Sequence, residues 1–165
     1  DIPHKYIMRS GQLAFGTQIK GITKTLEKWK NIYKNADEYI YEILSEIPGD
    51  LFDPLTKKVK AGIKSRYIVS EFASVPQGRK AELKRSGFNK LIEKGLIERK
   101  MRKHVKVIIV LNEKEACVCF PDLNGEADLT EMFYGNDYQF HEWCIDYFKD
   151  CWSDADLFIE SKLKE

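Results

Sequence analysis

Hydrophobic positions in the first two thirds of the chain switch repeatedly between helical and strand spacing. Ile22, Leu26, Trp29 and Tyr33 recur at helical intervals and predict a helix over about 21–35. The same spacing predicts helices over about 50–62, with Asp50 as N-cap, and over about 77–94. Short apolar runs bounded by turn residues predict strands over 39–44, 66–69 and 96–101.

The last third of the chain favours strands first and a helix at its end. Two apolar runs, 105–110 and 116–120, predict an antiparallel hairpin, and 132–134 predicts a further short extended piece. Asn136 or Asp137 is a helix-start signal for the last helix. That helix carries an aromatic and cysteine stripe typical of a core-facing surface, made of Phe140, Trp143, Cys144, Tyr147, Phe148, Cys151 and Trp152.

Together these elements predict an α/β fold, in which helices flank a mixed β-sheet. The expected order is helix, strand, helix, strand, helix, three strands and a final helix. Residues 1–18, interrupted by Gly11 and Gly16, are expected to form an N-terminal arm or linker, and residues 19–165 the domain itself.

The composition of the 165 residues, 43% of them hydrophobic, fits one domain with a substantial core. The longest apolar run, 105–111, is interrupted by Lys106 and is far shorter than the ~20 residues that span a bilayer. No charged and then apolar leader opens the chain. We therefore expect a cytoplasmic protein without membrane contact. Because the first residue is Asp and not Met, the chain is expected to be part of a longer protein.

The four cysteines lie in two pairs, 117 with 119 and 144 with 151, and neither pair has the Cys-x-x-Cys spacing of zinc ribbons. Buried reduced thiols are the expected state. A metal site that includes His141, or a disulfide, is the alternative, and no cofactor is expected.

Charge is unevenly distributed, although the net charge is only +1. Residues 76–107 hold eleven Lys and Arg against three Glu, whereas residues 108–165 hold fourteen acidic residues against four Lys. The basic stretch has two interpretations: a nucleic-acid-binding module, or a solvated face that the acidic part neutralises within the molecule.

Candidate chemistry lies at the start of the 105–110 strand, where His104 and Lys106 would share one face. In phospholipase D-like enzymes a His-x-Lys unit is followed, after four further residues, by an Asp, and the site needs two such units. The Asp position is Leu111 here, and neither His4 nor His141 has a Lys two residues later. The pattern indicates a pocket that is retained after the catalytic activity has been lost, so no enzyme is predicted.

The order of elements, the 117–120 strand and above all two motifs resemble one family. The motifs are Tyr-Gly-Asn-Asp at 134–137 and the aromatic helix at 140–152. Over about 21–155 the chain is similar to the C-terminal effector domain of archaeal TrmB-like helix-turn-helix transcription regulators, which has a phospholipase D-like fold. The resemblance implies a dimeric sensor of a small-molecule effector, joined to a DNA-binding winged helix absent from these residues. Sugar-sensing relatives carry a further β-rich module, and the residues after Ala155 are too few to form one.

Candidate ligand-binding residues are those expected at strand ends around the His-x-Lys unit. They are His104, Lys106, Glu71, Phe72, Ser45, Glu46, Arg66 and Tyr134. Lys106 would attract an anion, and His104 would supply a hydrogen-bond donor. Two alternatives stay open: His104 and Lys106 simply face solvent, or a homodimer supplies a second His-Lys pair for phosphodiesterase or nuclease chemistry.

Overall fold

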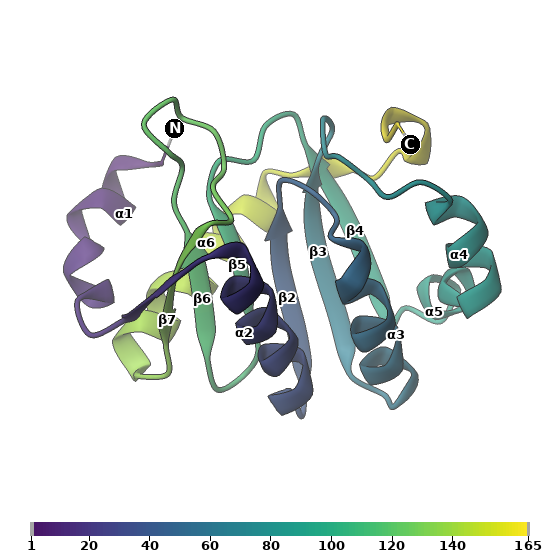
Figure 1. Ribbon diagram of the computed structural model, residues 1–165, viewed down its shortest axis with the longest axis horizontal. Helices are drawn as coiled ribbons and strands as arrows, with labels where there is room; N and C mark the ends of the chain where they lie inside the picture. Colours follow the sequence, from purple (N-terminus) through teal and green to yellow (C-terminus); the bar gives the residue numbers. More distant parts are fainter. Residues whose placement is uncertain (1, 165) are drawn as a thin grey trace.

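A single eight-stranded mixed sheet forms the centre of the computed structural model, which describes residues 2–164 (Figure 1). The strand order is β1-β7-β6-β5-β2-β3-β4-β8. The strands are β1 (Thr17–Lys20), β2 (Tyr39–Leu44), β3 (Lys64–Ser70), β4 (Ile97–Arg102), β5 (Ile108–Leu111), β6 (Ala116–Cys119), β7 (Glu131–Gly135) and β8 (Asp156–Leu157). The predicted α/β fold with a mixed sheet is confirmed.

Strand direction divides the sheet into two parts. β2, β3 and β4 are parallel, because helices between them return the chain to the same edge each time. β5, β6, β7 and β1 pair antiparallel on the other side of β2, and β8 pairs antiparallel with β4. The carboxyl ends of β2 and β3 therefore lie at the same edge as the start of β5.

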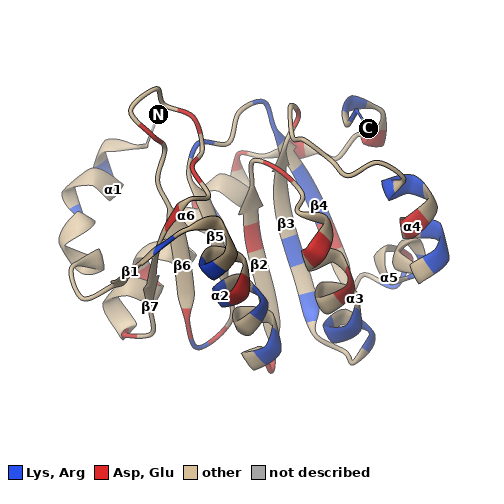
Figure 2. Ribbon diagram, in the orientation of Figure 1, with Lys and Arg blue, Asp and Glu red and all other residues tan. Residues whose placement is uncertain are grey.

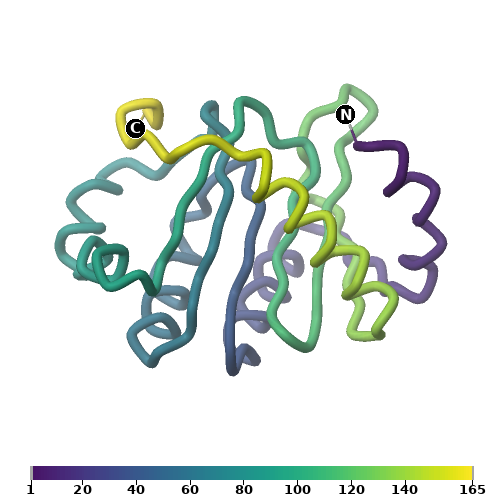
Figure 3. The backbone as a smooth tube through the Cα atoms, turned by 180° about the vertical axis from the view of Figure 1, so that it is seen from behind, coloured from purple at the N-terminus to yellow at the C-terminus, as the bar shows by residue number. Residues whose placement is uncertain are grey.

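Helices cover both faces of the sheet. α2 (Ile22–Asn35), α3 (Phe52–Lys60), α4 (Arg79–Ser86) and α5 (Phe88–Glu93) contribute to one apolar core. On the other face, α6 (Tyr138–Ser153) crosses the sheet diagonally and forms a second core with α1 (His4–Met8) (Figure 3). Short 3₁₀ turns span Ser10–Leu13, Gly49–Leu51 and Glu160–Lys162.

The aromatic stripe of α6 faces the core, as its spacing predicts. Phe140, Trp143 and Phe148 are buried, and the Tyr6 ring of α1 packs edge-on against Trp143 with 5.4 Å between centroids. Asp137 caps the helix through a 3.0 Å hydrogen bond from the Phe140 amide to its carboxylate. Residues 4–13, expected to belong to an arm, thus lie against α6.

Two predicted details are wrong at the level of single elements, and two strands were not predicted. The helix expected over 77–94 is two helices, because Gly87 adopts φ 76° and ends α4 in a left-handed conformation. Asp50 lies inside a 3₁₀ turn and does not cap α3, for which Leu51 occupies the N-cap position without a side-chain bond. The edge strands β1 and β8, which are short and mostly exposed, have no alternating pattern that predicts them.

The basic stretch is partly neutralised by the acidic end of the chain. Arg79 and Arg99 both form ion pairs with Glu160, the latter at 3.2 Å. Figure 2 shows the charged residues spread over several helices and strands rather than gathered on one element. This arrangement favours the second interpretation of the basic stretch.

The cysteines are all buried free thiols. No helix within residues 2–164 combines the length and apolar character needed to cross a membrane.

Candidate ligand-binding cleft

A cleft of about 270 Å³ opens at the edge of the sheet where β2 and β3 end and β5 begins. Ligands of α/β proteins commonly bind at the carboxyl ends of parallel strands, because loops converge there and leave a hollow. The cleft is lined by Ser45, Glu46, Ser70, Phe72, Ser74, His104, Val105, Lys106, Glu126 and Ala127.

Five of the eight predicted residues come together in this cleft. Ser45 and Glu46 follow β2, Phe72 follows β3, and His104 and Lys106 precede β5. Because β2 and β3 are parallel and β5 runs against β2, all three loops meet at one edge. The structure brings these five residues together; ligand binding by them is a separate proposal below.

His104 and Lys106 lie in a loop and not on a strand, which corrects the expected start of the strand at residue 105. β5 begins at Ile108 because neither neighbouring strand, β2 or β6, extends far enough to pair with the residues before it. β2 ends at Leu44, the position opposite Ile108, and β6 ends at Cys119, shortly before Pro121, which has no amide hydrogen to donate. The 103–107 segment is free to bend around the cleft.

Hydrogen bonds fix the two loops that carry Phe72 and His104. The Ser70 hydroxyl donates to the Lys103 carbonyl at 3.3 Å and accepts from the Phe72 amide at 3.1 Å. The Phe72 ring, 68% exposed, stacks on the His104 imidazole with centroids 5.3 Å apart and planes inclined by 27°. The stack presents an aromatic and polar wall at the mouth of the cleft.

The 121–127 loop, which the sequence did not connect with the site, supplies another wall. Asp122 holds this loop by accepting hydrogen bonds from the Asn124 and Glu126 amides, both at 2.9 Å. Those backbone amides also lower the pKa of the Asp122 carboxyl below its usual value. Glu126 consequently lies beside the cleft, and Lys106 Nζ lies 3.4 Å from where a Cβ on Gly125 would stand.

The remaining three candidates lie elsewhere. Glu71 lines an adjoining hollow and pairs with Lys162 at 2.5 Å. Arg66 pairs with Glu98 at 2.8 Å and lies 5.6 Å from the Trp152 ring, on the face of the sheet that α6 covers. Tyr134 donates its hydroxyl to Glu115 at 2.6 Å. The structure therefore does not bring Arg66 or Tyr134 to the cleft.

Leu111, at the position of the catalytic Asp in the pattern, is fully buried among the side chains that face α6. The neighbouring Asn112 donates to the Ile32 carbonyl at 2.8 Å and accepts from the Lys114 and Glu115 amides. Neither residue lines the cleft. The chain thus supplies no carboxylate or amide from this region to His104.

A buried acidic residue that the sequence analysis missed lies inside the sheet. Glu42, in the middle of β2, is 1% exposed and accepts a 2.8 Å hydrogen bond from Trp29 Nε1 and another from the Tyr33 hydroxyl. Burial raises the pKa of Glu42 to about 7, against the opposing effect of the two donors. Alternation along β2 places Glu42 on the same face as Ile40 and Leu44, which is the signal that identifies it.

Comparison with solved structures identifies the fold. TrmBL2, an archaeal chromatin protein whose structure shows a novel mode of DNA binding, matches with a TM-score of 0.68 and 17% identity, over 87% of this chain and 54% of that chain. NucT from Helicobacter pylori matches with a TM-score of 0.63 and 12% identity, over 87% and 98%. Nuc from Salmonella typhimurium, a phospholipase D family member, matches with a TM-score of 0.59 and 15% identity, over the same shares.

These comparisons show that the chain has the phospholipase D-like fold predicted from its sequence. It is a fold that an archaeal DNA-binding protein shares with phospholipase D family members. The chain spans about half the length of TrmBL2. No protein-family model and no curated protein sequence matches the chain.

Proposed function

We propose that this chain is a non-catalytic sensor domain that binds a small anionic molecule in the cleft between β2, β3 and β5. The observation that carries the proposal is the composition of the cleft. It gathers His104 and Lys106 with polar residues at the carboxyl ends of parallel strands, while the position of the catalytic Asp is a buried Leu111.

The cleft chemistry indicates a polar ligand with one anionic group. Lys106 offers a compact positive charge, and His104 offers a ring nitrogen as donor. Glu46 and Glu126 line the same cleft, where their carboxylates accept hydrogen bonds from hydroxyl groups but repel a second anion. A phosphorylated polyhydroxy molecule matches this distribution of charge.

The proposal of a non-catalytic role rests on the surroundings of His104. A nucleophilic histidine needs a partner that orients the ring and fixes its tautomer. The ring contact found for His104 in the described chain is the stack on Phe72, which supplies no acceptor. Loss of an orienting carboxylate typically lowers turnover by orders of magnitude.

We further propose that the domain acts within a longer, dimeric, cytoplasmic transcription regulator. The support is the similarity to TrmBL2, of which this chain matches 54%. In this proposal a winged helix outside these residues reads DNA. A ligand that prefers one arrangement of the dimer shifts the spacing of the DNA-reading helices by its differential affinity.

Calorimetric titration with glucose 6-phosphate tests the binding proposal. We expect binding to wild type and an affinity at least tenfold lower for Lys106→Ala, since a charge-assisted hydrogen bond contributes about 1.5–3 kcal/mol. Lys103→Ala is the matched control, because Lys103 is an exposed neighbour that does not line the cleft, and its affinity should equal that of wild type. Equal affinities for Lys106→Ala and wild type, or no binding at all, would remove the proposal.

A further inference from the structure

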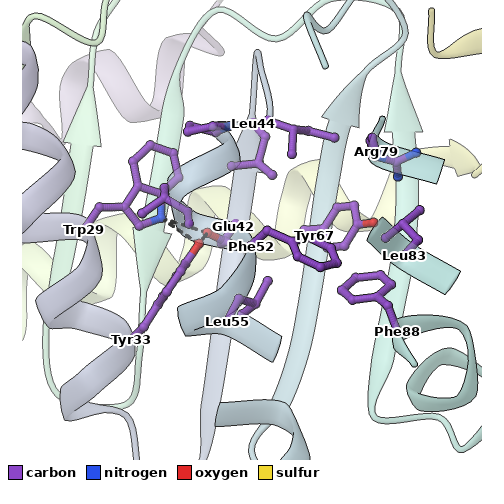
Figure 4. Close-up of a pocket in the computed structure, with 13 residues that line it drawn as sticks. Trp29, Tyr33, Glu42, Leu44, Phe52, Leu55, Tyr67, Arg79, Leu83 and Phe88 are labelled. Atoms are coloured by element: carbon purple, nitrogen blue, oxygen red, sulfur yellow. Dashed lines mark hydrogen bonds between the residues drawn. The ribbon is translucent and has the colours of Figure 1, made fainter. Parts of the chain in front are cut away.

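A separate apolar pocket, which shares no lining residue with the cleft, lies between the sheet and the helices α2 to α5 (Figure 4). Its volume is about 40 Å³. Since one water needs about 10–15 Å³ of such space, the pocket has room for about three or four waters, or for a small ion with about as many non-hydrogen atoms.

Aromatic rings form much of the wall of this pocket. Trp29 and Tyr33 come from α2, Phe52 from α3, Tyr67 from β3 and Phe88 from α5. Figure 4 shows Trp29 and Tyr33 at one end of this space, Phe52 in the middle, and Tyr67 and Phe88 at the other end. Aromatic faces carry negative electrostatic potential, and a group of them is the usual surroundings of a bound organic ammonium ion.

Glu42 places a carboxylate in the same wall. Trp29 and Tyr33 both donate to one oxygen, Oε1, which leaves Oε2 as the oxygen that a ligand reaches. None of the ion pairs found within residues 2–164 involves Glu42. A buried carboxylate without a cation is costly, and such a group is uncommon where it serves packing alone.

The one basic residue among those that line the pocket does not neutralise Glu42. Arg79 lines the pocket, but its guanidinium is paired with Glu160. Among its lining residues the pocket therefore has one carboxylate without a cation, mostly apolar side chains and no free positive charge. Its chemistry is complementary to a small cation with apolar substituents.

We propose that the pocket is a binding site for a small alkylammonium ion. The N–H of the ion donates to Oε2 of Glu42, and its alkyl groups contact the rings of Trp29, Phe52 and Phe88. The site differs from the cleft in residues and in ligand charge, so it stands or fails independently of the proposed function. Leu44, Ile47 and Pro48 line this pocket, whereas Ser45 and Glu46 between them line the cleft, so an ion bound here lies next to the segment that carries both cleft residues.

Trimethylammonium chloride is a suitable probe, with tert-butanol as a neutral molecule that also carries three methyl groups and one donor. The titration follows the indole N–H resonances in a ¹H–¹⁵N spectrum at pH 8, where Glu42 is largely ionised. We expect a saturable shift of the Trp29 resonance, with a Kd on the order of millimolar for so small a ligand. The indole resonances of Trp143 and Trp152, which lie on the α6 face, should not move with it.

The preference for trimethylammonium over tert-butanol, in wild type and in two variants, tests the proposed site. Tert-butanol should bind at least tenfold more weakly than trimethylammonium, and Glu42→Gln, which keeps an acceptor for Trp29 and Tyr33, should abolish that preference. Leu55→Phe, which fills the pocket, should weaken both ligands. Equal binding of the two ligands to wild type, an unchanged preference in Glu42→Gln, or no shift of Trp29 would overturn the proposal.

Discussion

Burial of the Glu42 side chain in β2 makes its ionisation part of the stability of the fold. Oε1 has two donors but the carboxylate has no cation, so the folded protein favours the neutral acid and the pKa rises to about 7. In an unfolded chain the same group titrates near 4.5. The neutral form contributes its full stabilisation below pH 4.5, and this contribution is lost as the pH rises to about 7.

Glu42→Gln should therefore remove one pH dependence of stability. Relative to wild type, the free energy of unfolding of Glu42→Gln should increase by about 3 kcal/mol between pH 4.5 and pH 8, because a shift of one pKa unit corresponds to about 1.4 kcal/mol. Urea denaturation of both proteins at a series of pH values measures the difference. If the free energies of unfolding of the two proteins changed in parallel with pH, the pKa of Glu42 in the folded protein would not be raised.

Position 135 requires a glycine because a larger side chain has no space there, and not because its backbone adopts a positive φ. A Cβ at this position would lie 2.3 Å from Cγ of the buried Phe140 ring. Gly135→Ala should destabilise the fold by about 1–3 kcal/mol, as overpacking does. Gly11→Ala is the control, with no atom within 4 Å of the added methyl group, and should change stability by less than about 0.5 kcal/mol. Equal midpoints of thermal unfolding for the two variants would contradict this account of Gly135.

Sequence reasoning located cleft residues where they follow strand ends, as for Ser45, Glu46 and Phe72. It did not place Arg66 and Tyr134, because their partners, Glu98 on β4 and Glu115 in the β5–β6 turn, are specified by no local pattern. Glu42 was overlooked although the alternation along β2 marks it as inward-facing. Its hydrogen-bond partners on α2 depend on how that helix packs, which the pattern does not give.

At the scale of elements, α6 was predictable because its signals are local. Asp137 stands before an aromatic stripe at helical spacing, and its carboxylate accepts from the Phe140 amide at 3.0 Å. The break between α4 and α5 also has a local cause, Gly87, but a single glycine within a helical pattern does not by itself predict a break. The start of β5 depended on where β2 and β6 end, which is tertiary information.

Removal of the α6 cap should have a measurable effect on the whole fold. Asp137→Ala should lower the free energy of unfolding by about 1 kcal/mol, whereas Asp137→Asn, which keeps a side-chain acceptor, should lower it by much less. Chemical denaturation followed by circular dichroism gives both values. If both variants lose the same stability, the hydrogen bond to the Phe140 amide is not what stabilises this helix end.

At the scale of the whole molecule, the parallel order of β2, β3 and β4 creates the cleft. Alternation of helices and strands predicted this part of the sheet, and therefore predicted that loops following β2 and β3 share an edge. The placement of the 121–127 loop and of β1 beside β7 was not predictable, because both depend on contacts between distant segments. The shared fold with TrmBL2 and Nuc leaves binding and catalysis to be decided by the cleft residues.

The most direct test of a cleft that binds phosphate without cleaving it is ³¹P spectroscopy of bis-p-nitrophenyl phosphate with the protein. The account predicts that wild type shifts or broadens the phosphodiester resonance, that Lys106→Ala does not, and that no phosphomonoester resonance appears during prolonged incubation. A monoester resonance that grows with wild type and is absent with His104→Ala would contradict the account and establish a phosphodiesterase.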